Sequence, residues 1–597
     1  MSRKFIIRRL GVFSIFLEPS RLRAFARSSE LGLIFAAAVV GVVSGCVVTG
    51  MSLISQAMHR SIFQLDDGVR LSSIAAADWT LLFLAPIAGG AVLGLLLFVL
   101  TRYRKKPMVD PIEANALHGG RLSLNDSLIV AAQNLISNGF GASVGLEAGY
   151  TQLASGFASK IGLLLQLRRA DLRILVGCGA SGAIAAAFNA PLTGSFYAFE
   201  LIIGSYAIVS LAPVIVAALI SNLVARAFAA DNFLIEIGNF GSVIPADYIP
   251  ALMLGFLCAG AGILLMKGVA FVEETARKSF IPPYLRPLIG GALVGGLALV
   301  TPQVLSGGHG ALHLNLDQQG TMMAVLGILL LKALASAISI GSGFRGGLFF
   351  GSLFMGALLG KLFAFFAALV FAHTTFTPVT YALVGMSALA VSVIGGPLTM
   401  TFLALEITGD FPIMVLVLAA VITASVTVRN TFGYSFATWR FHLRGESIRS
   451  AHDVGWIRNL TVGKLMRADV RTASVHTSVK QFRQDFPLGS SQRVIILDDN
   501  GKYVGIVLVP EAHAGVTENS DEDKLITDLI RYQNDFLQPE MNAKQAARLF
   551  DETESEALAV VNDFIERRVV GLLTESHTLR RYSEELDRQR RSAAGEI

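Results

Sequence analysis

The residue best placed to do chemistry in this sequence is Glu147, in the segment Gly145-Leu146-Glu147-Ala148-Gly149. The segment opens an apolar stretch of helix type in a region that otherwise avoids charge. An ionisable side chain at membrane depth is costly unless it lines a pathway. A helix N-terminus also attracts anions through its unpaired amides and positive dipole end. A glutamate at such a terminus can fill an anion site itself and yield to a permeant anion, which is the chemistry of a gate.

Two more carboxylates end the two copies of an internal repeat. Residues 191–200 and 397–406 both read P-L-T-x-x-F-x-A-x-E, which puts Glu200 and Glu406 at equivalent positions. This equivalence favours a structural role, in which each carboxylate bonds backbone amides of a broken helix.

A second echo lies elsewhere in the chain. Residues 141–143, ahead of Glu147, resemble residues 341–343, ahead of Phe349. Duplicated half-spans interrupted by Gly or Pro point to an inverted-repeat transporter with its site near the membrane midplane. Glycine lets such broken helices turn sharply and pack closely.

The elements that must position these residues are membrane spans. The chain has 597 residues, of which 53% are hydrophobic and 16% are charged, and its mean hydropathy is +0.59. These values exclude an ordinary soluble protein. Uncharged runs long enough to cross roughly 30 Å of hydrocarbon recur. The clear runs are Leu31–Ala57, Trp79–Leu100, Leu201–Ala225 and Phe411–Val428, and shorter or Gly-broken segments include Ala251–Met266 and Leu362–Ala372.

The charged residues and the cysteines indicate topology rather than a soluble binding surface. Lys and Arg cluster before the first run, at 102–106 and at 168–173, so we expect these segments and the N-terminus in the cytoplasm. The net charge of +5 follows from this topology, and no basic, aromatic-studded soluble face suggests nucleic-acid binding. Cys46, Cys178 and Cys258 lie in apolar segments, where we expect small buried residues without disulfide or metal spacing.

The composition changes near Trp439, after which charge returns and the hydrophobic runs shorten. Two copies of a strand-turn-strand pattern with flanking amphipathic helices follow. The first copy predicts strands at 493–497 and 503–507, and the second predicts strands at 557–561 and 569–573. Such patterns predict a compact soluble α/β pair.

From about Leu31 to Arg440 these segments resemble the CLC family of chloride channels and proton-coupled chloride antiporters. Gly179–Leu192 follows the family's helix-packing segment almost residue for residue. Residues 145–149 stand where the family has G-[RK]-E-G-P, which makes Glu147 the counterpart of its gating glutamate.

The resemblance implies an anion site built mainly from backbone amides. Residues 341–351 stand where the family has G-S-G-x-x-x-G-I-F-A-P, so the amides of Leu348 and Phe349 would donate to a dehydrated anion. Tyr434 stands where the family has its pore tyrosine. Partial charges release an ion faster than a fixed Lys or Arg would. The implied anion-binding residues are Met108, Leu146, Glu147, Ala148, Leu348, Phe349 and Tyr434.

Three departures from the family pattern bear on the transported ion and on coupling. By spacing, Met108 takes the place of the family's anion-contacting serine, which puts chloride selectivity in question and resembles the fluoride-exporting branch. Arg345 either raises the local anion concentration or pairs with a carboxylate at a cytoplasmic mouth. Leu201 falls where antiporters carry the proton-transfer glutamate. An apolar residue there favours uncoupled conduction, although some antiporters of the family lack that carboxylate.

The C-terminal copies resemble a tandem CBS module, which binds adenine nucleotides in other proteins. Nucleotide-binding copies end in G-[VI]-[VI]-[TS]-x-x-D, whereas residues 505–511 lack the hydroxyl. The second copy keeps Thr574 but has His577 in place of the aspartate. A structural or dimer-coupling role is therefore favoured over nucleotide binding at Thr574.

The expected fold is an all-α polytopic membrane domain, a CLC-type inverted repeat of broken and tilted helices, followed by a cytoplasmic α/β tandem CBS domain. The predicted boundaries are a cytoplasmic segment 1–30, a transmembrane domain 31–442 with repeats 31–230 and 247–440, a linker 443–458, CBS copies 459–517 and 523–585, and a charged tail 586–597.

The sequence supports three functions for this chain. The first is a chloride channel gated by Glu147, the second is a proton-coupled chloride or fluoride antiporter, and the third is a non-conducting membrane sensor. No enzyme is expected, because H-E-x-x-H, G-x-S-x-G and P-loop motifs do not occur. We expect a multi-pass inner-membrane protein with both termini in the cytoplasm and no cofactor. Its homodimeric state is implied by the resemblance alone.

Overall fold

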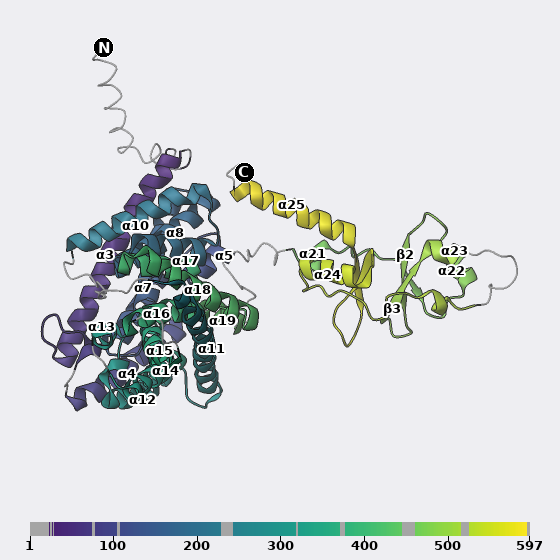
Figure 1. The fold of residues 1–597 in the computed structure, drawn as a ribbon. Coiled ribbons are helices and arrows are strands. Elements are labelled where there is room, and N and C mark those ends of the chain that lie inside the picture. The colour runs from purple at the N-terminus through teal and green to yellow at the C-terminus, as the bar shows by residue number, and fades with distance from the viewer. Residues whose placement is uncertain are drawn as a thin grey trace, which may run out of the picture. The chain divides into compact units, whose positions relative to one another are not determined.

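The computed structural model describes residues 23, 25, 27, 29–74, 78–103, 108–228, 243–317, 320–370, 377–443, 460–514 and 524–593. The chain divides into two compact units, Met1–Asp453 and Val454–Ile597, and each is described by itself (Figure 1). Most of the predicted N-terminal segment, the basic residues 104–106, the linker from 444 to 458 and the last four residues of the tail lie outside the described residues.

The regular elements of the first unit are all helices in the part of the chain that the structure describes. Eight of its described helices are long and apolar enough to cross a membrane. Its first part contains α3 (Glu30–Phe63), α4 (Trp79–Tyr103), α5 (Pro111–Leu117), α6 (Leu124–Gly139), α7 (Glu147–Leu164), α8 (Arg169–Phe188), α9 (Pro191–Tyr197), the π-helical turn η2 (Ala198–Ile203) and α10 (Ile208–Phe228). Its second part contains α11 (Tyr248–Lys278), α12 (Arg286–Val300), α13 (His309–Asp317), α14 (Met322–Ser342), α15 (Phe349–Val370), α16 (Pro378–Ile394), α17 (Pro397–Thr408), α18 (Phe411–Thr431) and α19 (Phe436–Leu443).

Three apolar runs differ from their sequence-based description. The described part of Leu362–Ala372, up to Val370, lies inside the 22-residue helix α15. The segment Ala251–Met266 is not a short element, because it lies inside the 31-residue helix α11. The run Leu201–Ala225 is not continuous, because it breaks at Gly204 before α10 begins. Gly204 adopts φ +78°, a left-handed conformation that favours glycine and ends the preceding turn.

The two P-L-T repeats meet as a reciprocal clamp. Glu406 accepts hydrogen bonds from the Leu192 and Thr193 amides of α9, both at 2.8 Å. The Leu398 and Thr399 amides of α17 donate to Glu200, both at 2.9 Å. Each threonine hydroxyl also donates to the same carboxylate. The expected structural role of these two carboxylates is therefore observed, with each one capping the opposite repeat's broken helix.

Stacked rings and close helix contacts hold the rest of the seam together. The rings of Phe196 and Phe402, at equivalent repeat positions, stack with centroids 4.3 Å apart. Helices α4 and α12 approach closely at a glycine, since a Cβ at Gly90 would lie 2.2 Å from the Pro287 carbonyl oxygen.

Cys178 and Cys258 are buried as expected, but Cys46 is exposed, so the expectation of burial was wrong there. Its helix, α3, turns that face away from the packed core.

The second unit is α/β, as expected, and repeats its pattern twice. The first copy holds α21 (Val462–Leu465), β1 (Thr472–Ser474), α22 (Val479–Asp485), β2 (Arg493–Leu497), β3 (Tyr503–Leu508) and α23 (Val509–His513). The second holds η5 (Ile526–Leu529), α24 (Ala543–Thr553), β4 (Ala557–Val561), β5 (Val569–Thr574) and α25 (Glu575–Ala593). The pairs β2–β3 and β4–β5 are antiparallel hairpins, and β1 adds in parallel to β2. The four long strands match the predicted ones within a residue or so, while the short β1 was missed.

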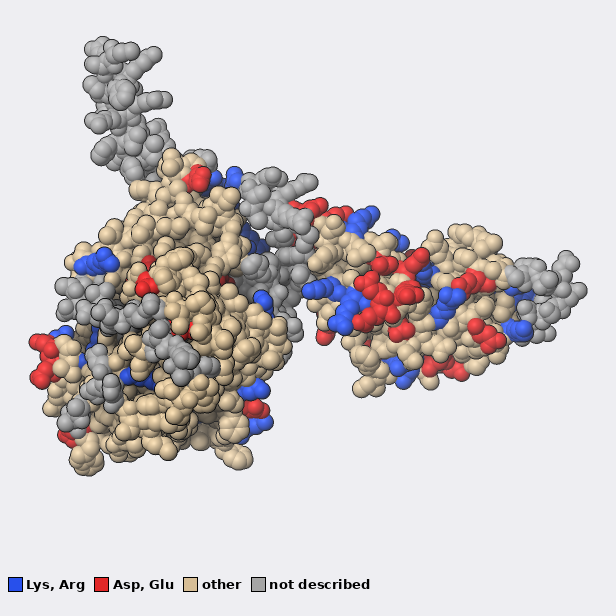
Figure 2. Space-filling view, in the orientation of Figure 1, with Lys and Arg blue, Asp and Glu red and all other residues tan. Residues whose placement is uncertain are grey.

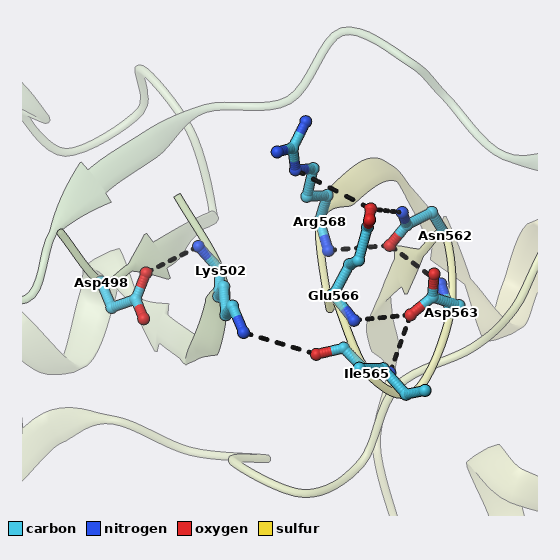
Figure 3. A network of polar contacts seen from close by, with 7 residues as sticks. All are labelled: Asp498, Lys502, Asn562, Asp563, Ile565, Glu566 and Arg568. Carbon is cyan, nitrogen blue, oxygen red and sulfur yellow. Dashed lines mark hydrogen bonds and ion pairs between the residues drawn. The ribbon is translucent and has the colours of Figure 1, made fainter. Parts of the chain in front are cut away.

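A polar network joins the two copies of this unit (Figure 3). Asp498 accepts from the Lys502 amide in the first hairpin turn, and the Lys502 ammonium donates to the Ile565 carbonyl of the second copy at 3.5 Å. Asp563 accepts from the amides of Ile565 and Glu566, which fixes the second turn. Figure 2 shows that charged side chains are dense on this unit and sparse on the visible face of the helical one.

Candidate functional site

The two glycine-rich loops predicted from the second echo meet inside the helical unit. The Gly145 amide donates to the Gly347 carbonyl at 3.0 Å, and the Gly347 amide donates back to the Gly145 carbonyl at 3.3 Å. Asn134 is buried beside this pair, and its Nδ2 donates to the carbonyls of Gly145 and Arg345, both at 3.0 Å. The crossing therefore places the N-terminus of α7, at Glu147, against the N-terminus of α15, at Phe349. First-turn amides of a helix have no acceptor within the helix, so both termini favour negative charge.

The Glu147 carboxylate folds back over this crossing. The residue is 4% exposed, and its own backbone amide hydrogen-bonds the carboxylate. A Cβ built on Gly145 would lie 1.9 Å from Glu147 Oε2, and one on Gly347 would lie 3.9 Å from the same atom. Within the described part of the chain, Oε2 is buried without a hydrogen-bond partner. The two glycines thus leave the space that the Glu147 carboxylate occupies, and one oxygen of that carboxylate has no hydrogen-bond partner among the described residues.

Glu147 separates two cavities. The first has a volume of about 200 Å³ and the second about 550 Å³. Among the residues that the structure describes, Glu147 is the one that lines both. A change in its side-chain position is therefore the smallest movement that could join the two spaces.

The first cavity gathers most of the predicted site residues. Met108, Glu147, Ala148, Leu201, Leu348 and Phe349 all lie on its wall. The same wall carries polar side chains that the sequence did not single out, namely Asp110, Asn134, Thr151, Gln152 and Tyr197. Arg345 also lies there, with Arg440 of α19. Arg440 forms a 3.8 Å ion pair with Glu273.

The second cavity is lined by Leu146, the remaining predicted residue near the gate, and by several cationic or hydrogen-bonding side chains. These include His59, Arg60, Arg70, Ser306 and His309. Asp67 lies on the same wall and pairs with Arg60. The formal charges of Arg60 and Arg70 on this wall are balanced by those of Asp67 and Glu147.

The structure does not bring Tyr434 to either cavity wall among the described residues. Its ring packs against Phe432 and Trp439, with centroids 6.1 Å and 5.3 Å away. The tyrosine that does line the first cavity is Tyr197, at the end of α9. The available signal was a difference between the repeats, because Leu403 occupies the equivalent place in the second copy.

Sequence reasoning also missed Lys332, a fully buried cation on α14. Its ammonium donates to the carbonyls of Val304 at 3.0 Å and Ser306 at 2.7 Å. Lys332 and Glu147 act on one another electrostatically. The available signal was a single Lys inside the apolar run 322–342, where a charge is costly unless it has a partner.

In the second unit, Thr574 ends β5 and its hydroxyl accepts the amide of His577 at 3.4 Å. The pKa of His577 is lowered, first by partial burial and then by the nearby charges of Arg580, Arg467 and Arg581. These cations suit an anionic group, and the Thr574 hydroxyl accepts one hydrogen bond within the turn.

Comparison with known proteins places these features in a wider group. The profile of the family described as "Voltage gated chloride channel" matches residues 89–429. A ClcB-like protein of Ralstonia nicotianae, named as a putative chloride channel protein, is 31% identical over 371 residues, covering 61% of this chain and 86% of that one. The voltage-gated ClC-type chloride channel ClcB of Escherichia coli is 29% identical over 400 residues, covering 66% and 95%.

Solved structures show the same fold. The crystal structure of a slow cyanobacterial Cl⁻/H⁺ antiporter matches with a TM-score of 0.61 and 22% identity, covering 69% of this chain and 97% of that one. A eukaryotic CLC transporter matches with a TM-score of 0.57 and 16% identity, covering 91% and 97%. The latter likeness extends into the second unit, because the first 453 residues alone cannot supply 91% of the chain.

Proposed function

This chain belongs to the voltage-gated chloride channel family, and from that premise we propose that it carries chloride across a membrane through a path gated by Glu147. The family consists of channels and transporters, so the chain is a multi-pass membrane protein and not an enzyme. The observation that carries the gating proposal is the position of Glu147 between two cavities, on the wall of both. When its carboxylate is ionised it occupies the place between the helix termini, and when it is protonated or displaced an anion can enter.

The anion site is formed by groups at the crossing of the two loops. First-turn amides at Leu348 and Phe349 would donate to the ion, beside Ala148 and Met108 on the same wall. Leu146 lines the other side. These assignments, and that of Tyr434, remain proposals. Met108 offers no hydroxyl donor, so fluoride and chloride both belong in any test of selectivity.

Uncoupled chloride conduction is the version that Leu201 favours, because an apolar side chain there can neither hold nor pass a proton. A proton-coupled antiporter is the second candidate. It is favoured by the polar side chains Asp110, Thr151 and Tyr197 on the same cavity wall. Simultaneous recording of anion and proton movement separates the two versions.

The test is reconstitution of the purified protein in liposomes with chloride or fluoride gradients while protons are recorded. We expect Glu147→Gln to remove the pH dependence of anion flux, since the amide cannot ionise. Glu274→Gln serves as the matched control, because Glu274 lies on α11, is half exposed, and pairs with Lys278. If Glu147→Gln left the pH dependence as in the unchanged protein, the gating proposal would be wrong.

We further propose a homodimer in the bacterial inner membrane with both termini in the cytoplasm. The second unit is interpreted as a tandem CBS pair in that compartment. We do not propose nucleotide binding at Thr574, because His577 stands where nucleotide-binding copies carry an aspartate. A sensor without anion flux is disfavoured by the two cavities that meet at Glu147.

A further inference from the structure

The cavity wall at Leu201 is apolar at that position but not around it. Asp110, at the start of α5, and Tyr197, at the end of α9, line the same cavity of about 200 Å³. Thr151, one turn along α7 from Glu147, lies on that wall as well. The wall therefore offers a carboxylate, a phenol and an aliphatic hydroxyl in place of a carboxylate at 201.

These three side chains are linked to one another and to the gate. The Tyr197 hydroxyl hydrogen-bonds the Thr151 side chain, and Asp110 and Glu147 both act on Tyr197 electrostatically. The Thr151 hydroxyl donates to the Glu147 carbonyl at 2.9 Å. Tyr197 is thus within electrostatic reach of two carboxylates, Asp110 on the cavity wall and Glu147 at the gate.

The segment that carries Asp110 is fastened to the gating helix. Gln152 Nε2 donates to the Val109 carbonyl at 3.0 Å and to the Ser127 hydroxyl at 3.2 Å. Asp110 also caps α5 by accepting from the Glu113 amide at 2.9 Å. These bonds fix the separation between Asp110 and α7, which a proton route requires.

We propose that protons reach Glu147 from this cavity through Asp110, Tyr197 and Thr151, and this inference rests on the proposed gating role of Glu147. A proton arrives on the Asp110 carboxylate. Each hydroxyl then accepts one proton and releases its own, directly or through water that the cavity is large enough to hold. The proton ends on the Glu147 carboxylate, and no hydroxyl keeps a net charge. The route serves a channel, by opening the gate, as well as an antiporter.

Other charged groups lie along this route and affect whether Glu147 is ionised. Arg345 and Arg440 lie on the cavity wall, and Lys332 acts on Glu147 from α14. The cations favour an ionised Glu147, so a proton on it is readily displaced when no anion competes. An anion arriving among the same cations offsets their charge, which favours protonation of the gate.

The test uses the full-length protein in a bilayer, with the pH of each face changed separately. We expect Tyr197→Phe, which keeps the ring and removes the hydroxyl, to slow the response of anion flux to acid on one face by about tenfold or more. Thr151→Val should act in the same way. The response to acid on the opposite face should stay within about twofold, because neither side chain lines the second cavity among the described residues.

Tyr206→Phe is the matched control, since Tyr206 donates to Glu200 at 3.0 Å and is not on either cavity wall among the described residues. Asp110→Asn keeps the helix cap, because asparagine caps as well as aspartate, and should reproduce the one-sided loss. Unaltered responses in both Tyr197→Phe and Thr151→Val, with Glu147→Gln still insensitive to acid, would overturn the route and leave the gate intact. A pH response that survives Glu147→Gln would instead overturn the proposed function.

Discussion

Gly145 shows how a single residue can set the resting state of the gate. The space where its side chain would be is filled by the Glu147 carboxylate, with Oε2 1.9 Å from a Cβ position. The obstacle is the far end of a flexible side chain rather than backbone. A methyl group at 145 should therefore displace the carboxylate without unfolding the loop.

Gly145→Ala is predicted to raise anion flux at neutral pH severalfold and to weaken its dependence on acid, since the seat of the closed carboxylate is lost. Gly260→Ala is the control, because a Cβ at Gly260 meets nothing within 4 Å. Flux from liposomes at pH 7 and pH 5 measures the effect. Wild-type flux and pH dependence in Gly145→Ala would show that the carboxylate does not close the path from this seat.

At the residue scale the sequence was most informative where a charge is costly. Glu147 could be found because a carboxylate is conspicuous in an apolar segment with flanking glycines. Tyr197 and Thr151 could not, because a tyrosine or threonine in an apolar run is inexpensive and common. Their importance comes from their position on one wall with Asp110, which only the packing of α5, α7 and α9 creates.

At the scale of elements, the paired clamp of α9 and α17 makes a quantitative prediction. Glu406 accepts at both oxygens, so Glu406→Gln would turn one acceptor into a donor that faces donors. We expect it to lower the free energy of unfolding by about 1.5–3 kcal/mol. Glu200→Gln should cost at least as much, because its bonds to α17 are equivalent and it also accepts from the Tyr206 hydroxyl.

Denaturant unfolding in detergent measures both changes. Glu274→Gln on α11 is again the control and should change stability by about 0.5 kcal/mol or less, as expected for an exposed ion pair. A lower free energy of unfolding in one clamp variant but not in the other would show that the two carboxylates contribute unequally to stability.

The hydrogen bonds of Tyr503 in the second unit predict that its stability falls at alkaline pH. The Tyr503 hydroxyl of β3 donates to the carbonyls of Tyr532 at 2.7 Å and Asp535 at 3.3 Å. Burial above all, and then the charge of Asp535, raises the pKa of Tyr503 above its usual range. The folded chain thus keeps a proton that the unfolded chain loses near pH 10. Its stability should be constant below that pH and fall as pH rises further.

Tyr503→Phe should reduce this alkaline loss, while costing about 1 kcal/mol at pH 7 because two carbonyls lose their donor. Hydrogen exchange of β3 amides in the full-length protein at pH 7 measures the stability cost. Unfolding series at increasing pH, up to pH 11, measure the alkaline loss. Tyr103→Phe, at a side chain that is 80% exposed, is the control. An unchanged alkaline slope would assign the loss to another group.

Elements were predicted well where their pattern is local and poorly where it depends on a neighbour. The hairpins β2–β3 and β4–β5 follow from alternating apolar residues and a turn, and they formed nearly as predicted. Strand β1 is three residues long and exists because β2 offers an edge, so its sequence carries little signal. The break at Gly204 was hidden for a similar reason, since hydropathy averages over a single residue.

At the scale of the whole molecule, the two units divide the work. All residues on both cavity walls lie between Val48 and Arg440, inside the first unit. A chain ending at Asp453 is therefore expected to keep anion flux with its Glu147 dependence. Side-by-side flux of the truncated and full-length proteins tests this, with Glu147→Gln introduced into each. Loss of flux in a truncated chain that still folds would assign the second unit an obligatory part in transport.

The reciprocal clamp has a consequence for the path of an anion through the protein. The positive ends of α9 and α17 are filled in advance by the chain's own carboxylates, Glu406 and Glu200. These carboxylates exclude a permeating halide from the two termini, whereas at α7 and α15 the halide competes only with the movable Glu147 carboxylate. Because the chain's own carboxylates fill these alternative anion sites, a halide is kept on one route. Removing either carboxylate would create an additional site at which the halide could bind.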